Sequence, residues 1–122
     1  MQFRLTTALL AVTAALGGVA ATPAAPKVRA AQASLVVCTD KNFSGKCQSI
    51  GFNNAQCVVF PSGFQKDISS IAPPSGWVCD AYIDLVCTGD GLGDITSPGI
   101  SDLGDHHTNY NDRLNSFVCY TT

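Results

Sequence analysis

Six cysteines are the residues of this 122-residue chain whose chemistry is most constrained by number and spacing. Cysteines bind metal ions, act as nucleophiles or pair as disulfides. The spacings of 9, 10, 22, 8 and 32 residues contain no C-x-x-C pair, which argues against a zinc site. We therefore expect three disulfides, and spacing alone leaves fifteen pairings open. The six are Cys38, Cys47, Cys57, Cys79, Cys87 and Cys119.

Residues suited to catalysis form no recognisable site. Ser, His and Asp all occur, but no serine lies in a nucleophile-elbow motif. His106 and His107 are adjacent, so on an extended chain they point to opposite faces. We expect them in a surface loop rather than in a metal site or a pH switch. All nine acidic residues are Asp, so a glycosidase would have to use an Asp pair. We expect a protein that is not an enzyme.

The glycine-rich segment Gly89–Asp94 invites comparison with a phosphate-binding loop. No lysine and no helical pattern follow it, and its two Asp residues would repel phosphate. Its spacing also differs from that of an EF-hand. The turn-forming composition predicts a mobile acidic loop.

The N-terminal segment is typical of a secretory signal peptide over residues 1–21. Arg4 precedes the apolar run Ala8–Leu16, and small residues follow at the expected cleavage site. A membrane anchor is the alternative, but the run is short and diluted by small residues. Residues 22–34 are rich in Ala and Pro and suggest a linker or pro-segment. We expect a secreted protein, without a transmembrane segment in its mature chain, whose folded domain spans residues 35–122.

Charge is distributed unevenly along that domain. Residues 35–122 contain four Lys and Arg against nine Asp, a net charge of −5. Residues 79–122 contain one basic residue against seven Asp, a net charge of −6. This acidity suits cation binding or a basic partner, or serves solubility alone. Seven Lys and Arg spread over the whole chain argue against nucleic-acid binding.

Short apolar or alternating segments separated by turn residues predict an all-β domain. Such spacing is typical of a sandwich or barrel. No stretch after residue 34 has the 3.6-residue period of a helix. The expected strands lie near residues 35–38, 46–52, 57–60, 68–72, 77–82 and 114–120.

An internal repeat divides the domain into two motifs, at about 35–75 and 76–122. The segment Gln65–Ile71 aligns with Asn111–Phe117 at an offset of 46 residues. A segment that starts at Cys38 aligns with one that starts at Tyr82, at an offset of 44. Two repeats of short strands suggest two Greek keys packed as one sandwich.

At these positions the sequence resembles the βγ-crystallin superfamily. Asn42-Phe43-Ser44-Gly45 is similar to the hairpin of the family's first motif, and Ile68–Pro73 to its last strand. Gly76 and Trp77 then open a second motif, in which Tyr82 occupies the first aromatic position. The resemblance implies a βγ-crystallin-like sandwich of two Greek-key motifs, stapled by disulfides.

Two cysteines stand where that family's motif has aromatic residues: Cys38 in the first motif and Cys87 in the second. In this the chain resembles the secreted, disulfide-bearing microbial branch, which includes killer-toxin-like and protease-inhibitor-like proteins. If the first and last strands of a motif are neighbours, as the resemblance implies, Cys79 pairs with Cys119. The resemblance leaves the other four cysteines unassigned.

The resemblance also implies a calcium site. The family's signature is two Asn or Asp residues, two variable residues, Ser or Thr, and Ser. Asn111 and Asp112 begin a match that departs only at the fifth position, Asn115. Sharing of ligands between motifs would add Ser69, whereas Lys66 would repel a cation at the equivalent place. We expect at most one weak calcium site; the alternative is ordinary turn chemistry.

The function expected from these features is that of a small secreted interaction protein. We predict a fungal effector, elicitor or antimicrobial protein, monomeric, that acts on an extracellular protein, cell-wall or membrane target of another organism. An extracellular calcium-binding, protective protein is the alternative, and a secreted protease inhibitor is a further one. Asn42-Phe43-Ser44 is also a sequon, so Asn42 is a candidate glycosylation site.

Overall fold

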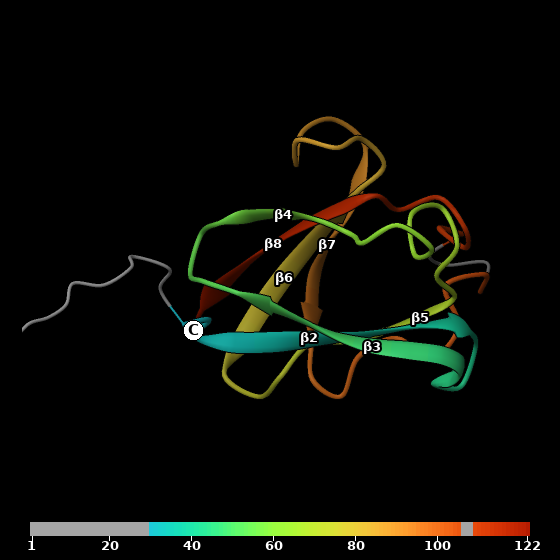
Figure 1. The fold of residues 1–122 in the computed structure, drawn as a ribbon, viewed down its shortest axis with the longest axis horizontal. Helices are drawn as coiled ribbons and strands as arrows, with labels where there is room; N and C mark the ends of the chain where they lie inside the picture. The colour runs from blue at the N-terminus through green and yellow to red at the C-terminus, as the bar shows by residue number, and fades with distance from the viewer. Residues whose placement is uncertain (1–29, 106–108) are drawn as a thin grey trace, which may run out of the picture. The chain divides into compact units, whose positions relative to one another are not determined.

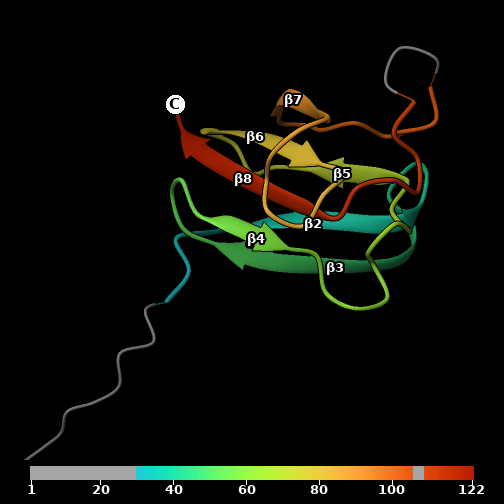
Figure 2. The same cartoon turned by 90° about the horizontal axis from the view of Figure 1, so that it is seen from above.

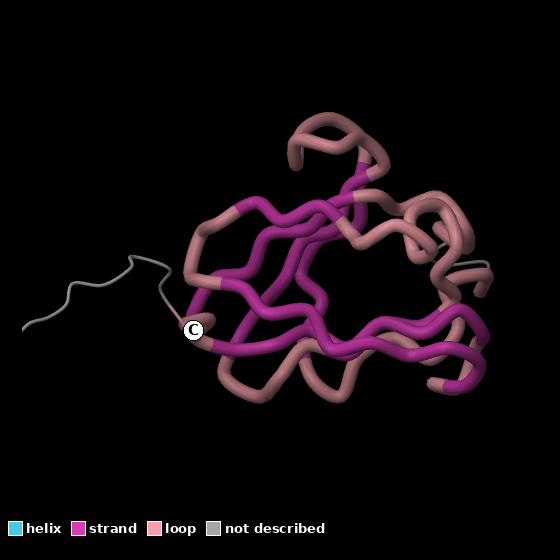
Figure 3. The backbone as a smooth tube through the Cα atoms, in the orientation of Figure 1, coloured by secondary structure: helices cyan, strands magenta, loops and turns pink. Residues whose placement is uncertain are grey.

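The computed structural model describes residues 30–105 and 109–122. The predicted signal peptide (1–21), His106 and His107 lie outside the described residues. The part of the chain that is described consists of strands and loops (Figure 3). None of it forms a helix that is long and apolar enough to cross a membrane.

Seven strands form two antiparallel sheets within the described ranges. One sheet has the order β3-β2-β5 and the other the order β4-β8-β6-β7, and their strands cross at an angle in Figures 1 and 2. The predicted all-β sandwich is thus confirmed. The strands are β2 (Ala33–Asp40), β3 (Ser44–Phe52), β4 (Cys57–Val59), β5 (Ser70–Ala72), β6 (Trp77–Tyr82), β7 (Gly91–Thr96) and β8 (Ser116–Thr121).

The two repeats exchange segments between the sheets. Strand β4 belongs to the first repeat but pairs with β8 of the second, with Val58 opposite Phe117. In return, Ile100 of the second repeat forms a bridge with Ile71 of β5. Neither repeat completes its own sheet, so the two Greek keys depend on each other.

The core lies between the two sheets and is built from inward-facing residues of both repeats. Leu35 and Val37 alternate along β2 and are fully buried. Phe52 of β3 packs edge-on against Trp77, with ring centroids 4.9 Å apart, and against Phe117 at 5.8 Å. These aromatic contacts join β3 of the first repeat to β6 and β8 of the second in one core.

The structure corrects the prediction that Gly89–Asp94 is a loop, because residues from Gly91 onward form strand β7. Gly91 lies opposite Tyr82 in the ladder, and a Cβ at this position would overlap the Ala81 carbonyl oxygen and lie 2.8 Å from the ring atom Cδ1 of Tyr82. Glycine is needed here because the backbone of β6 and the Tyr82 ring approach closely, so the glycine-rich composition of this segment did not indicate a loop. On the N-terminal side of the domain, β2 begins at Ala33, within the segment 22–34 that was predicted as a linker or pro-segment.

Three disulfides connect the strands, and no free cysteine is present among the described residues. The pair implied by the family resemblance is present, with Cys79 of β6 directly opposite Cys119 of β8. Cys38 and Cys47 are likewise opposite each other, in the neighbouring strands β2 and β3. The bonds join Cys38 to Cys47, Cys57 to Cys87, and Cys79 to Cys119.

Removal of the Cys79–Cys119 bond should cost more stability than removal of the Cys38–Cys47 bond. The first closes a sequence separation of 40 residues and the second one of 9. Chain entropy predicts losses of about 4 and about 2.6 kcal/mol respectively. Guanidinium unfolding of the two double Cys→Ala variants measures both losses. Equal losses, or the reverse order, would contradict the entropic account.

Candidate functional site

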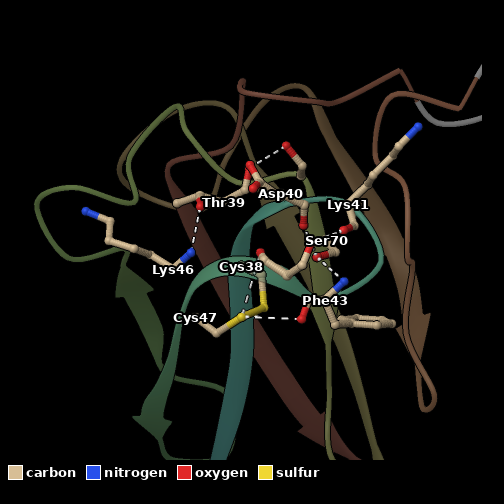
Figure 4. Close-up of a disulfide and its surroundings, with 10 residues drawn as sticks. Cys38, Thr39, Asp40, Lys41, Phe43, Lys46, Cys47 and Ser70 are labelled. Atoms are coloured by element: carbon tan, nitrogen blue, oxygen red, sulfur yellow. Dashed lines mark hydrogen bonds between the residues drawn. A yellow bond between two sulfur atoms is a disulfide. The ribbon is translucent and has the colours of Figure 1, made fainter.

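Side chains at the start of β5 hold the hairpin between β2 and β3 in place. The Ser69 hydroxyl donates a hydrogen bond to the Thr39 carbonyl (2.8 Å), and the Ser70 hydroxyl donates one to the Asp40 carbonyl (2.7 Å). The Ser70 oxygen also accepts the Phe43 N–H at 3.2 Å, a contact visible in Figure 4. These bonds pair the buried hydroxyls of Ser69 and Ser70 with backbone groups of the chain reversal.

The second repeat reproduces this arrangement at its own hairpin, between β6 and β7. The Asn115 amide donates to the Ile83 carbonyl (2.6 Å), and the Ser116 hydroxyl donates to the Asp84 carbonyl (2.7 Å). The Ser116 oxygen accepts the Cys87 N–H at 3.1 Å. The sequence offsets of 44 and 46 residues therefore correspond to equivalent hydrogen bonds. Asn115 substitutes for a serine in this structural role.

The first hairpin borders a cavity of about 580 Å³ that gathers residues from both repeats. Ser69 and Asn111, two of the four predicted calcium ligands, both line it. The side chains that decide its chemistry offer two carboxylates, two amides, a hydroxyl and an ammonium group. They are Asp40, Asp102, Asn42, Asn111, Ser69 and Lys41.

The other two predicted ligands do not line this cavity. Asp112 is exposed, has a left-handed backbone (φ 58°), and donates its N–H to the Ile68 carbonyl. Lys66 has the same conformation (φ 55°) at the equivalent position of the first repeat. Asn115 is buried and lines the cavity at the second hairpin. The calcium signature is therefore divided, with Asn111 at the first hairpin cavity and Asn115 at the second.

The cavity at the second hairpin has a different character. Its volume is about 490 Å³, and apolar side chains occupy positions that are polar in the first. Leu85 and Val86 replace Lys41 and Asn42 at the offset of 44 residues. Lys66 places a positive charge in this cavity, which opposes cation binding. The two equivalent hairpins thus present a polar surface and an apolar one.

Hydrogen bonds and a disulfide hold the backbone of the second hairpin around the apolar residues Leu85 and Val86. The Asp84 carboxylate accepts the N–H groups of Val86 (3.0 Å) and Thr88 (3.1 Å) and the Thr88 hydroxyl. These bonds, led by that of the Thr88 hydroxyl, lower the pKa of Asp84 below its ordinary value. The next residue, Cys87, is bonded to Cys57 of β4. Yet Leu85 and Val86 remain 51% and 66% exposed.

Asp40 and Asp102 are site residues that sequence reasoning missed. The repeat contained a signal for Asp40, since it aligns with Asp84 in the other hairpin. Asp102 has no such counterpart and approaches the site only through the exchanged segment near Ile100. Asn42, the candidate glycosylation site, is exposed in the hairpin. No cluster of three or more His, Cys, Asp or Glu suited to a metal was found among the described residues.

Solved structures provide the comparison that identifies the fold. A structure concerned with evolution of the eye lens βγ-crystallin domain fold matches with a TM-score of 0.61, 18% identity, and coverage of 80% of this chain and 95% of its own. The protein has the βγ-crystallin fold. A βγ-crystallin from Ciona intestinalis matches with a TM-score of 0.53, 22% identity, and coverage of 70% and 96%.

A third βγ-crystallin domain comes from the Abundant Perithecial Protein of Neurospora crassa, solved in its Ca²⁺-bound form. It matches with a TM-score of 0.50, 19% identity, and coverage of 80% of this chain and 96% of its own. Sequence comparison with family models and with curated proteins gave no match. At these identities the likeness establishes the fold and leaves function to the residues of this chain.

Replacement of Thr88 by valine should raise the pKa of Asp84 toward its ordinary value, because the leading hydrogen bond is lost. A lowered carboxyl pKa stabilises the fold above the unfolded pKa, and this gain is lost as pH falls through the folded pKa. Thr88→Val should therefore lose stability at neutral pH but not below the folded pKa. NMR titration measures the pKa of Asp84, and chemical unfolding at several pH values measures the stability. Thr88→Ser, which keeps the hydroxyl, should behave as wild type; an unchanged pKa in Thr88→Val contradicts the assignment.

Proposed function

We propose that this βγ-crystallin-fold protein is a secreted, non-enzymatic interaction protein that acts on another organism as an effector, elicitor or antimicrobial protein. The observation that carries the proposal is the second hairpin, in which Leu85 and Val86 are exposed on a fixed backbone. The predicted signal peptide and the three disulfides support export, since disulfides persist in oxidising compartments.

A fixed apolar loop is suited to binding a protein or cell-surface partner. Because the Asp84 hydrogen bonds and the Cys57–Cys87 bond already order the loop, little conformational entropy is lost on binding. The equivalent hairpin folds with Lys41 and Asn42 at these positions, so the apolar pair is not required for the turn. Exposed apolar pairs that folding does not require favour an interaction surface.

The double substitution Leu85→Lys/Val86→Asn should abolish the biological activity while leaving the fold intact. It places the residues of the first hairpin, where both are exposed, at the equivalent positions of the second. We expect a potency at least about tenfold lower on plant tissue or competing microbes. Thermal unfolding should be unchanged, and Lys41→Ala in the first hairpin is the matched control. A wild-type protein without effect on either organism, or an active double variant, would overturn the proposal.

A secreted protease inhibitor is the narrower form of this function. Inhibition of a panel of secreted peptidases that is lost in the same double variant would favour it over a toxin or elicitor. Both forms place recognition in the residues that follow Asp84.

Calcium binding is a second candidate function, and the first cavity favours it. Asp40, Asp102, Asn111 and Ser69 offer the oxygen ligands that calcium prefers. The Neurospora crassa structure in its Ca²⁺-bound form adds weight to this candidate. The donor set fits one ion, held by residues of both repeats, although Lys41 would weaken it. A bound ion would add a link between the two repeats and so stabilise a protective extracellular protein.

Calcium at 10 mM should raise the unfolding temperature if it binds with a Kd of about 1 mM, because such binding stabilises the fold by about 1.4 kcal/mol. Calorimetry should detect the same event. Asp40→Asn and Asp102→Asn should each weaken binding, whereas Asp112→Ala should leave it unchanged. Absence of heat and of a thermal shift, or an effect of Asp112→Ala as large as that of Asp40→Asn, contradicts this site.

A further inference from the structure

A shallow groove lies on the outer face of the four-stranded sheet and shares no lining residue with either hairpin cavity. Its volume is about 300 Å³, and it runs between β6 and β7. Asp80 and Tyr82 alternate along β6 with the buried residues Cys79 and Ala81, so both point outward into the groove. The groove therefore belongs to a surface that neither proposed function uses.

Glycines keep the floor of this groove free of side chains. A Cβ at Gly91 would overlap the Ala81 carbonyl oxygen and lie 2.8 Å from Cδ1 of Tyr82, and one at Gly93 would lie 3.1 Å from Oδ1 of Asp80. The tyrosine ring and the carboxylate of β6 therefore extend over bare backbone of β7. The result is a shallow groove lined by an aromatic ring and two carboxylates.

The two carboxylates of the groove are positioned differently. Asp80 accepts the Asp94 N–H through Oδ1 at 3.0 Å, which orients its carboxylate and leaves the other oxygen available. Asp94 is exposed, with a left-handed backbone (φ 58°). Burial, followed by the charge of Asp80, raises the pKa of Tyr82 above its ordinary value.

We propose that this groove binds a neutral carbohydrate chain. The C–H face of a pyranose ring is apolar and packs on an aromatic ring, and its hydroxyls donate hydrogen bonds to carboxylates. Tyr82 supplies the ring, and Asp80 and Asp94 supply the acceptors. The net charge of −6 over residues 79–122 disfavours phosphates, sulfated sugars and uronic acids. A cation would use the carboxylates but has no need of the ring or of the glycine floor.

NMR titration of the isotope-labelled exported protein, with EDTA present, tests this inference. The probes are hexasaccharides of β-1,3-linked glucose, β-1,4-linked N-acetylglucosamine and α-1,6-linked mannose. At least one should shift the amide signals of residues 80–82 and 91–94. Asp80→Asn and Asp94→Asn should each weaken binding about fivefold, because a neutral acceptor replaces a charged one.

Tyr82→Leu should abolish binding while still covering Gly91, so loss of the flat ring is separated from loss of the fold. Asp67→Asn, an exposed carboxylate elsewhere, is the matched control, and thermal unfolding confirms that each variant is folded. The inference is overturned if no probe shifts any signal, if the shifts lie at a hairpin cavity, or if the groove variants bind like wild type. A groove that responds to calcium alone also overturns it. Of these outcomes, only shifts at a hairpin cavity bear on the hairpin surfaces.

Discussion

The hydrogen bonds from the last strand of each repeat to its own hairpin are the interaction on which the rest of this structure depends. Ser69 and Ser70 bind the carbonyls of Thr39 and Asp40, and the second repeat has an equivalent pair. These partly buried bonds fix each chain reversal to the last strand of its repeat. Both hairpin cavities, and the loops that border them, take their shape from these bonds.

The equivalent hydrogen bonds of the two hairpins explain how one domain presents two different surfaces. Hydrogen bonds from the last strand of the repeat hold each turn, so the side chains at the tip of the turn can differ in character. The first tip has Lys41 and Asn42 beside a cavity of oxygen donors, whereas the second has Leu85 and Val86. Duplication followed by divergence at the tips is therefore enough to separate a polar site from an apolar one.

The disulfides supply part of the stability that a larger hydrophobic core would otherwise provide. Cys38 and Cys87 occupy positions where the family resemblance places aromatic residues, and both now form covalent links. The described core still contains the aromatic cluster around Phe52 and Phe117, which joins the two sheets. In a domain of this size, cross-links compensate for the limited apolar surface that folding can bury.

Local patterns in the sequence were sufficient for the all-β class, the repeat and the number of disulfides, because alternation, turn residues and cysteine number are properties of the chain itself. The family resemblance added the Cys79–Cys119 pair. The local patterns failed at Gly91, where glycine permits close approach of the Ala81 carbonyl and the Tyr82 ring in a strand. The calcium signature implied by the resemblance grouped Asn115 with Asn111, although the two line different cavities.

Tertiary structure alone decided which distant residues meet. Asp102 and Asp40 line the same cavity, and Cys87 is bonded to Cys57, because each repeat gives a segment to the other repeat's sheet. The sequence determined two similar repeats, each with a hairpin. The pairing of β4 and of Ile100 with strands of the other repeat determined which residues line the cavities at these hairpins. The physical reason is that strand pairing across repeats is selected by burial of one common core, which no local segment encodes.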